Sequence, residues 1–333
     1  MNDLTIATPK ADEHNKPCPL ISVAICTYNR ADRLVFALDS LCCQSLPIEY
    51  FEIVVIDNCS TDDTKKICTR YQQHLPNLRY IYEPIIGLSK ARNTAIEKAR
   101  GEYLAFLDDD AIPCPIWLEK IIETYQTIKP TPVCVGGPIY PLWDSSKPDW
   151  ISKEVEYLFS ILDLGEKPQW LKLPKHLFGA NMTYQREALQ LVGGFSENLG
   201  RQGSKNLLSC EEYLAYQMLV AQGKGLFYYH PQVSVQHWIA QKRVNLNWML
   251  WRSYWQGRSS AVVRFILGKT LQEEWKQILV GLLKQRRPFL MLWSLLRAWS
   301  NPKLKTTAQM KIARSWGYLY QVCLNSSPKI SHD

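Results

Sequence analysis

A regular alternation of short apolar runs and helical patterns over the first 110 residues constrains the fold of this chain more than any other feature. The apolar runs have the length and composition of buried strands, and they cover residues 20–26, 51–56, 78–82 and 103–107. This β-α-β order predicts a mainly parallel sheet with right-handed crossovers, flanked by helices. The expected fold class is therefore α/β and Rossmann-like.

Helices are predicted between these strands and after them. Their expected spans are 31–44, 60–74, 88–100, 115–128, 186–192 and 210–222, with short strands at 133–135 and 225–229. Ser60 begins a capping-box pattern, which predicts the start of the second helix. Gly101 is the expected C-cap of the third helix. Residues 136–174 are rich in Pro and Trp, and we expect irregular structure over the sheet there.

Composition divides the chain of 333 residues into three expected parts. Residues 1–19 are polar and are predicted to form a disordered tail. A catalytic domain is expected over 20–240, followed by a helical, basic and aromatic extension over 241–333. The extension holds 16 Lys/Arg and 3 Asp/Glu, whereas the whole chain has a net charge of +8, so the basic charge is concentrated at one end.

The basic extension also contains many tryptophans, which are Trp248, Trp251, Trp255, Trp275, Trp293, Trp299 and Trp316. Helices with aromatic and basic faces can lie at a membrane interface, which suits peripheral membrane contact. A core and a solvated surface explain the same residues at least as well. Nucleic acid is not an expected partner, because no recognised binding motif accompanies the charge.

Cysteine usage and apolar segments bear on where the protein is located. Ten cysteines are scattered without a C-x-x-C pair or a zinc-site spacing, which is typical of a reduced, cytoplasmic protein. No apolar signal segment begins the chain. The longest apolar stretches, 278–283 and 288–296, are separated by Lys and Arg, and a membrane-spanning helix needs roughly 20 apolar residues in a row. We therefore expect a cytoplasmic protein, at most peripheral on the inner face of the plasma membrane.

Polar residues directly follow the predicted strands, where ligands bind in parallel sheets. They are Thr27, Tyr28, Asn29 and Arg30 after the first strand, Asp57 and Asn58 after the second, Glu83 after the third, and Asp108, Asp109 and Asp110 after the fourth. Three adjacent carboxylates repel one another and need a compensating cation. A divalent cation with oxygen ligands and a bound diphosphate would provide it. The alternative, a solvated acidic turn, is disfavoured by the position after an apolar strand.

Two further charged sites fall at predicted helix starts. Arg92 lies in the first turns of the third helix with Ser89 and Lys90, where anions are favoured. A plain surface arginine is the alternative. Glu211 and Glu212 begin a helix about 100 residues after the aspartates. Acids are common at helix N-termini for dipole reasons alone, but one of them could also act as a general base toward an acceptor hydroxyl.

His237 ends a strand-like stretch at 233–237. A lone histidine is more often structural than a ligand. Arg243, Arg252 and Arg258 follow it and could contact a phosphate or a membrane lipid. All four rank below the carboxylates as candidate site residues.

Several short motifs occur in one order along the chain. They are Val23–Arg30 (VAICTYNR), Ile53–Asp57 with Ser60–Asp62, Gly87–Asn93 (GLSKARN), Tyr103–Asp110 (YLAFLDDD), Gly179–Asn181, Gly193–Phe195 and Leu207–Glu212. Each motif alone is weak, but their order is specific. On these motifs the chain from Ile21 to His237, about two thirds of its length, resembles a family 2 glycosyltransferase of the GT-A fold. Among the branches of that family, the chain most resembles the cyanobacterial polysaccharide-biosynthesis branch.

The resemblance implies inverting transfer of a sugar from a nucleotide diphosphate-sugar, by default a UDP-sugar, to a saccharide or lipid-linked acceptor in cell-surface polysaccharide biosynthesis. It implies donor binding by Thr27, Tyr28, Arg30, Asp57, Arg92, Asp108 and Asp109. It also implies Mn²⁺ or Mg²⁺ bound by Asp110, with Asp108 and His237. Glu212 would be the catalytic base, and Glu211 would orient it or contact the acceptor.

The chain departs from the family pattern in three places. Cys210 stands where the family usually has Gly, and Glu212 stands where Asp is commoner, so the reach of the base is altered. The Gln-x-x-Arg-Trp motif of the processive synthases is missing from the sequence, which favours addition of single sugars.

Two other functions remain open from the sequence alone. A sugar nucleotidyltransferase would be built on a similar sheet, but it normally has a Gly-rich loop after the first strand, whereas 26–30 contains no glycine. A non-catalytic nucleotide-sugar-binding or scaffold protein is the second alternative. The intact set of Asp108, Asp110 and Glu212 argues against it.

Overall fold

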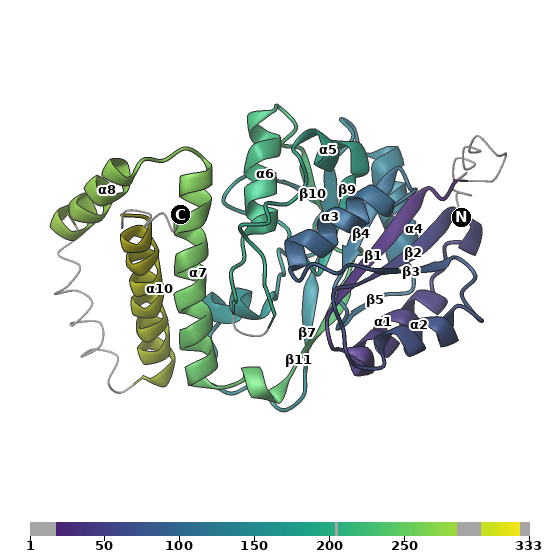
Figure 1. Ribbon diagram of the computed structural model, residues 1–333, viewed down its shortest axis with the longest axis horizontal. Coiled ribbons are helices and arrows are strands. Elements are labelled where there is room, and N and C mark those ends of the chain that lie inside the picture. The colour runs from purple at the N-terminus through teal and green to yellow at the C-terminus, as the bar shows by residue number, and fades with distance from the viewer. Residues whose placement is uncertain (1–17, 204–205, 285–300, 327–333) are drawn as a thin grey trace, which may run out of the picture. The chain divides into compact units, whose positions relative to one another are not determined.

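The computed structural model describes residues 18–203, 206–284 and 301–326, which form two compact units (Figure 1). The first unit contains the described residues up to Leu142 together with 160–197 and 211–238. The second contains 143–159, 198–210 and the described residues from Ile239 on. The predicted tail lies almost wholly outside the described residues, as do Trp293 and Trp299, and the predicted domain boundaries stay predictions.

The first unit is built on an eight-stranded sheet with the order β3-β2-β1-β4-β9-β6-β10-β8. The strands are β1 Ile21–Thr27, β2 Phe51–Asp57, β3 Leu78–Tyr82, β4 Tyr103–Leu107, β6 Cys134–Gly136, β8 Gln169–Leu171, β9 Asn181–Gln185 and β10 Phe227–Tyr229. The four strands from β3 to β4 run parallel. Both neighbours of β9 run antiparallel to it, and β8 is antiparallel to β10. The predicted α/β fold with a mainly parallel sheet is confirmed.

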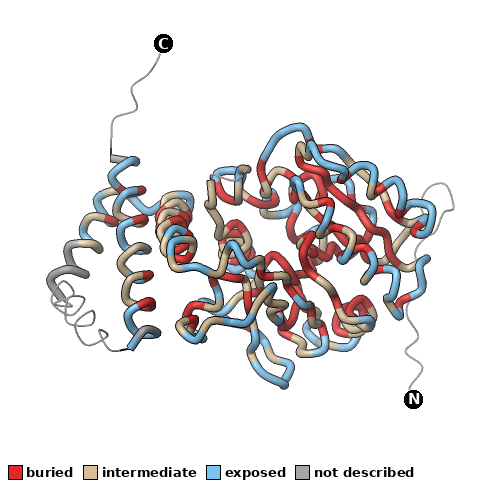
Figure 2. Tube along the Cα trace, turned by 90° about the horizontal axis from the view of Figure 1, so that it is seen from below, coloured by how far each residue is buried: buried red, intermediate tan, exposed pale blue. Residues whose placement is uncertain are grey.

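Helices cover both faces of this sheet. They are α1 Ala31–Cys42, α2 Thr64–Tyr71, α3 Leu88–Lys98, α4 Trp117–Thr127, α5 Arg186–Leu191 and α6 Glu211–Ala221. Successive strand residues point to opposite faces, so Val23 packs with α1, α2 and α4, whereas Ala24 packs with α3, α5 and α6. Every residue of β2 and β4 is buried. Figure 2 shows the buried segments mainly inside the trace and the exposed ones mainly at its margin.

A second, three-stranded sheet has the order β5-β11-β7. Its strands are β5 Ala111–Pro113, β7 Ile139–Trp143 and β11 Val235–Ile239. β5 begins directly after the three aspartates, and its antiparallel register pairs Ala111 with His237. The expectation of irregular structure over 136–174 was wrong for β7 and β8, because strands of three to five residues among prolines carry little periodicity.

Two predicted helix ends were also wrong. α2 begins at Thr64, after Asp63. The Asp62 carboxylate accepts hydrogen bonds from the Thr64 amide and hydroxyl, while the Ser60 hydroxyl accepts one from the Asn29 amide instead of capping the helix. α3 ends at Lys98, because the following residue is extended. Gly101 is needed for close packing instead, since a Cβ there would lie 2.6 Å from the Ser22 amide nitrogen.

The second unit is mainly helical, as predicted for the extension. Its elements are the short 3₁₀ turns Lys153–Phe159 and Gln241–Arg243 and the helices α7 Leu246–Ile266, α8 Leu271–Lys284 and α10 Pro302–Ser326. α7 packs on α10 through glycines, since a Cβ at Gly257 would collide with the Arg314 carbonyl oxygen and one at Gly317 with that of Tyr254. Among the described residues, no helix combines the length and the apolar character needed to cross a membrane.

Candidate active site

The carboxyl ends of three parallel strands bring the predicted polar residues to one edge of the large sheet. Thr27 ends β1 and is paired in register with Asp57, which ends β2. Asp108 directly follows β4, the other parallel neighbour of β1. Ligands bind at such an edge in open α/β sheets, because the connecting loops leave a crevice there.

Asp108, Asp110 and His237 form a compact cluster. One potential ligand atom from each of them lies within 4.8 Å of the other two. His237 Nε2 is 3.1 Å from Asp110 Oδ1, and both residues are almost completely buried. The pairing of β5 with β11 causes this proximity, because it sets His237 beside the residue that follows Asp110. No pattern in the sequence pairs these segments, which are more than 120 residues apart.

This cluster fits a divalent cation. Carboxylates are ordinary ligands of both Mn²⁺ and Mg²⁺, whereas the imidazole favours Mn²⁺, because Mg²⁺ prefers oxygen ligands. The Nδ1 atom of His237 is buried and has no hydrogen-bond partner among the described residues. The Nε2 atom, on the other side of the ring, faces Asp110 Oδ1 at 3.1 Å, so Nε2 is the nitrogen placed to bind an ion held by the carboxylates.

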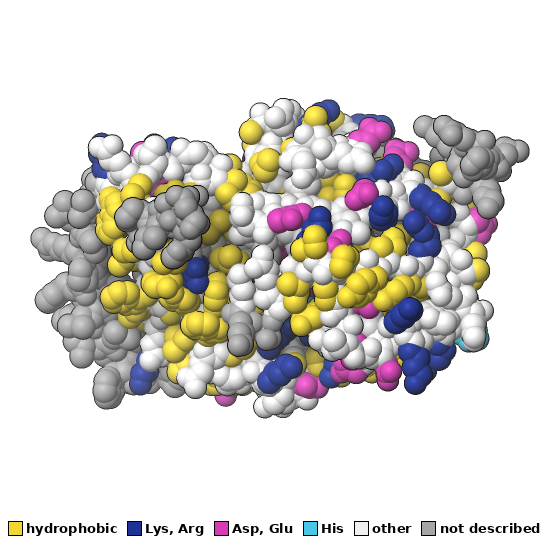
Figure 3. Space-filling model, in the orientation of Figure 1, with side chains coloured by type: hydrophobic (Ala, Val, Ile, Leu, Met, Phe, Trp, Pro, Cys, Tyr) yellow, Lys and Arg dark blue, Asp and Glu magenta, His cyan; other side chains and the backbone are white. Residues whose placement is uncertain are grey.

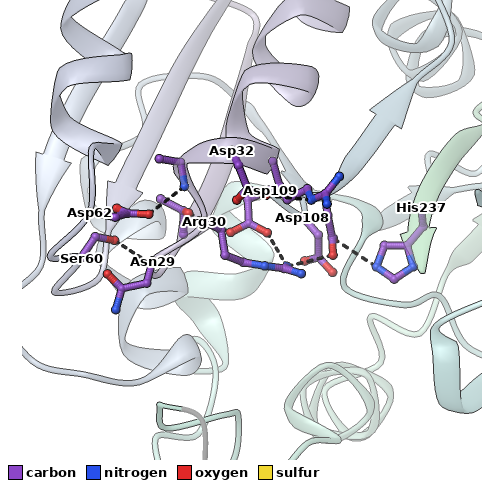
Figure 4. Close-up of polar contacts among 12 residues, drawn as sticks. Asn29, Arg30, Asp32, Ser60, Asp62, Asp108, Asp109 and His237 are labelled. Carbon is purple, nitrogen blue, oxygen red and sulfur yellow. Dashed lines mark hydrogen bonds and ion pairs between the residues drawn. The ribbon is translucent and has the colours of Figure 1, made fainter. Parts of the chain in front are cut away.

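Arg30 and Thr27 compensate the charge of the other aspartates. Arg30 Nη1 lies 2.7 Å from Asp109 Oδ1 and 2.8 Å from Asp110 Oδ2, and the Thr27 hydroxyl donates to Asp109 Oδ2 at 2.8 Å. Figure 4 shows Arg30 reaching the aspartates from the turn after β1, with His237 facing the same cluster from β11. Burial raises the pKa of Asp109 to about 6, against the opposing effect of Arg30.

Asp57 is buried, and both of its carboxylate oxygens accept hydrogen bonds. The donors are the Ser60 amide at 2.9 Å and the Tyr80 hydroxyl at 2.7 Å. Burial and the neighbouring Asp57 carboxylate raise the pKa of Tyr80. Tyr28, in contrast, is exposed. Sequence reasoning missed Tyr80, although its place on the strand next to Asp57 would have been a usable signal.

Asn58 is a second residue that the sequence reasoning left without a role. Its side-chain nitrogen donates to the Ile85 carbonyl oxygen at 2.7 Å, and its side-chain oxygen accepts from the Gly87 amide at 2.7 Å. Asn58 therefore fixes the loop that leads into α3. Gly87 is suited to this loop, because its φ of 152° is disfavoured for residues with a Cβ.

Arg92 joins the aspartates to the glutamates at the start of α6. Its guanidinium is buried, with Nη1 2.6 Å from Glu211 Oε1 and Nη2 3.7 Å from Asp108 Oδ1. Gly179 leaves room for it, since a Cβ there would collide with Arg92 Nη2. The carboxylates around it raise the pKa of Arg92 against the lowering effect of burial. Arg92 is therefore a buried charge in an ion-pair network, and the alternative of a plain surface arginine is excluded.

The two glutamates differ in their surroundings. Glu211 is buried and paired with Arg92. Glu212 is only half-buried, and its Oε2 atom has no hydrogen-bond partner among the described residues. Cys210, directly before them, has a φ of 73°. This is the left-handed conformation that glycine favours, so the backbone here keeps a glycine-like geometry although the residue is Cys.

The three arginines after β11 belong to the second unit. The Arg252 side chain donates to the Leu207 carbonyl oxygen at 3.3 Å, and Arg258 donates to Gln321 at 2.9 Å. Arg258 also lies over the ring of Trp255. These contacts of Arg252 and Arg258 lie within that unit.

Known proteins share this fold. The mannosyltransferase PcManGT of Pyrobaculum calidifontis, solved with GDP-Man and Mn²⁺, superposes with a TM-score of 0.53 at 19% identity, over 99% of this chain and 79% of that one. A TarS fragment from S. aureus in complex with UDP gives a TM-score of 0.52 at 19% identity, over 89% of this chain and 91% of that one. At these identities the likeness establishes the fold alone.

Sequence comparison establishes the family. Glucosyl-dolichyl phosphate glucuronosyltransferase of Haloferax volcanii is 26% identical to this chain over 245 residues, which are 73% of this chain and 77% of that protein. The model of the family described as Glycosyl transferase family 2 matches residues 22–193, just over half of the chain. The chain therefore belongs to glycosyl transferase family 2 and is a glycosyltransferase.

Proposed function

We propose that the protein transfers a sugar, with inversion, from a nucleotide diphosphate-sugar to a saccharide or lipid-linked acceptor in cell-surface polysaccharide biosynthesis. The observation that carries this proposal is the buried network of Asp108, Arg92 and Glu211, which connects the acidic strand end with the start of α6. The network links a site suited to a cation and diphosphate with a pair of carboxylates suited to proton transfer.

The donor lies along the sheet edge in this proposal. Thr27, Tyr28 and Asp57 hold the base and ribose, and Asp57 accepts from a base N–H in addition to its present donors. Arg30 and Arg92 face the diphosphate side, and Asp108 and Asp109 serve the ribose and diphosphate. UDP is the nucleotide proposed first, in agreement with the UDP bound by TarS, and GDP is its competitor because PcManGT was solved with GDP-Man.

Asp110, Asp108 and His237 would hold Mn²⁺ or Mg²⁺. When bound, such an ion supplies Lewis-acid stabilisation of the charge that develops on the leaving nucleoside diphosphate. Arg30 keeps Asp109 and Asp110 in place through its two ion pairs. Both aspartates are buried, which strengthens these charge interactions.

Glu212 acts as the general base. Because Arg92 occupies one oxygen of Glu211, that carboxylate is held in place, while the half-buried Glu212 has a buried oxygen without a hydrogen-bond partner among the described residues. Glu212 takes the proton of the acceptor hydroxyl as the hydroxyl oxygen attacks the anomeric carbon from the face opposite the diphosphate. The nucleoside diphosphate leaves with the bonding electrons, so the anomeric configuration inverts.

A lipid-linked acceptor would place the reaction at the cytoplasmic face of a membrane. The name of the Haloferax relative includes a glucosyl-dolichyl phosphate, which is a sugar attached to a lipid phosphate. The second unit supports the same proposal, because hydrophobic side chains gather over α7 and α10 in Figure 3 and α10 carries four Lys/Arg and no acidic residue. The protein in this proposal is cytoplasmic and peripheral on the inner face of the plasma membrane.

Nucleotide release is the test of this proposal. The full chain is incubated with UDP-glucose, UDP-N-acetylglucosamine, UDP-glucuronic acid or GDP-mannose, with Mn²⁺ or with EDTA, and released nucleoside diphosphate is measured. Cation-dependent release from one nucleotide family, abolished by Glu212→Gln or Asp110→Ala, supports the enzyme. Tight binding of a donor without any release, with or without simple glycosides as acceptors, would support the scaffold alternative instead.

A further inference from the structure

Three aromatic rings lie together beside the start of α6. The His176 ring centroid is 5.0 Å from that of Tyr213 and 5.1 Å from that of Phe178. All three side chains are half-buried. Tyr213 directly follows Glu212 in the first turn of α6, so this aromatic cluster of His176, Phe178 and Tyr213 lies at the end of the helix that carries the proposed base.

The segment that carries two of these rings is fixed in place. Leu177, between them, is buried in the core, and the Asn181 amide donates to the Phe178 carbonyl oxygen at 2.9 Å. Gly179 lies directly against Arg92, which is itself paired with Glu211. One buried network therefore anchors both the aromatic loop and the start of α6, and the rings form a rigid surface.

The chemistry of the cluster matches a sugar ring. A pyranose has an apolar C–H face and a polar rim, and the face of an aromatic ring carries negative charge that attracts polarised C–H groups. His176 Nδ1 lies 3.1 Å from the Pro174 carbonyl oxygen, which can only accept, so Nδ1 carries the proton. Burial lowers the pKa of His176 and keeps the ring neutral, which leaves Nε2 as an acceptor for a sugar hydroxyl.

We infer that His176, Phe178 and Tyr213 form an acceptor subsite that stacks a pyranose of the acceptor saccharide beside Glu212. This inference rests on the proposed transferase function. The stacked sugar presents a hydroxyl to Glu212, and the rings select by ring shape rather than by charge. Alternatively the cluster could contact the sugar of the donor, and the experiment separates the two sources.

The test measures saccharide binding by saturation-transfer NMR on the full chain with Mn²⁺ and UDP. The probes are the methyl glycosides of glucose, galactose, mannose and N-acetylglucosamine. In Tyr213→Ala and Phe178→Ala we expect the dissociation constant of the bound glycoside to rise about tenfold, which corresponds to about 1.4 kcal/mol. Tyr213→Phe keeps the ring and should bind as the unmodified chain does. Tyr140→Ala is the control, because Tyr140 is an exposed aromatic residue on β7, outside the cluster.

Three outcomes overturn the subsite. They are unchanged glycoside binding in both alanine variants, no saturation transfer to any glycoside in the unmodified chain, and a rise in the KM for donor hydrolysis in place of weaker glycoside binding. The last outcome would assign the rings to the donor sugar. Failure of the proposed function is distinguishable, because the unmodified chain would then release no nucleoside diphosphate from any donor, whereas failure of the subsite alone leaves that release intact.

Discussion

Arg92 Nη1 lies 2.6 Å from Glu211 Oε1, with each side chain 4% exposed, and the two residues are 119 positions apart in the sequence. α3 contributes the arginine and α6 the glutamate. The same guanidinium reaches Asp108 at 3.7 Å. The buried Arg92 guanidinium therefore connects the end of β4 with the start of α6, which carries the proposed base. A substitution at one of these two ends should therefore alter the position of the carboxylate at the other.

Removing Arg92 should destabilise the fold strongly. Arg92→Leu leaves Glu211 charged and buried without its arginine, which should lower the free energy of unfolding by about 3–5 kcal/mol. The double variant Arg92→Leu with Glu211→Leu should recover most of this loss, because the buried negative charge is removed together with the positive one. Urea denaturation of the unmodified chain, the two single variants and the double variant gives the coupling energy between Arg92 and Glu211.

Arg79→Leu is the control, because Arg79 is more exposed and its partner Glu52 keeps two other donors. Equal stability of Arg92→Leu and Arg79→Leu would contradict the network.

The two glutamates should separate into a base and a fixed partner. Glu212→Gln should lower kcat by about 10²–10⁴, the usual contribution of a general base, with little change in nucleotide affinity. Glu211→Gln should instead lower the midpoint of urea unfolding, because it removes the negative charge next to buried Arg92. Steady-state kinetics and urea unfolding of both variants test this. A Glu212→Gln protein with normal kcat would remove Glu212 from the mechanism.

Asp109 should make stability depend on pH in an unusual direction for an aspartate. Its pKa is about 6 in the folded protein and about 3.9 in an unfolded chain. Its stabilising contribution is therefore complete below about pH 4 and is lost as the pH rises through 6. Asp109→Asn should gain about 3 kcal/mol relative to the unmodified chain between pH 4 and pH 7. Denaturation at both pH values measures it, and a constant difference would contradict the raised pKa.

The helices of the second unit should bind anionic membranes. Trp251, Trp316 and Tyr320 are exposed on α7 and α10. Aromatic side chains favour the membrane interface, and each basic residue near an anionic surface adds about 1 kcal/mol. Replacing Trp251 and Trp316 with Ser should therefore weaken binding to phosphatidylglycerol-containing vesicles about tenfold or more in co-sedimentation. The control Trp170→Ser, in the first unit, should bind normally. Equal binding of the two variants would assign α7 and α10 to a solvated surface.

Local patterns in the sequence predicted the main sheet well. The spans of β3 and β4 agree with the structure residue for residue, because each is a compact apolar run between helical patterns. The placement of Thr27, Asp57 and Asp108 at one edge followed from parallel pairing alone. Motif order then supplied the family, which the match over residues 22–193 confirms.

Long-range pairings could not be predicted in this way. The approach of His237 to Asp110 depends on β5, a strand of three residues with no detectable period. The partners of Arg30 and Arg92 are 79 and 119 positions away, so no local pattern reveals them. A buried arginine on a short helix resembles a surface one in the sequence, because only the packed structure shows which side chains surround it.

Calorimetric titration of UDP and GDP into the full chain, with Mn²⁺ and with EDTA, tests whether Asp110 and a cation are needed to bind the donor nucleotide. We expect one nucleotide to bind only with Mn²⁺. Asp110→Ala should abolish this binding, and Asp63→Ala, at an exposed acid before α2, should leave it intact. A thermal shift provides a second readout, since a ligand at 100 times its dissociation constant stabilises the fold by ~2.7 kcal/mol. Nucleotide binding that is equal with and without Mn²⁺ and in Asp110→Ala, or no binding of either nucleotide, would rule out a cation-dependent donor site at Asp110.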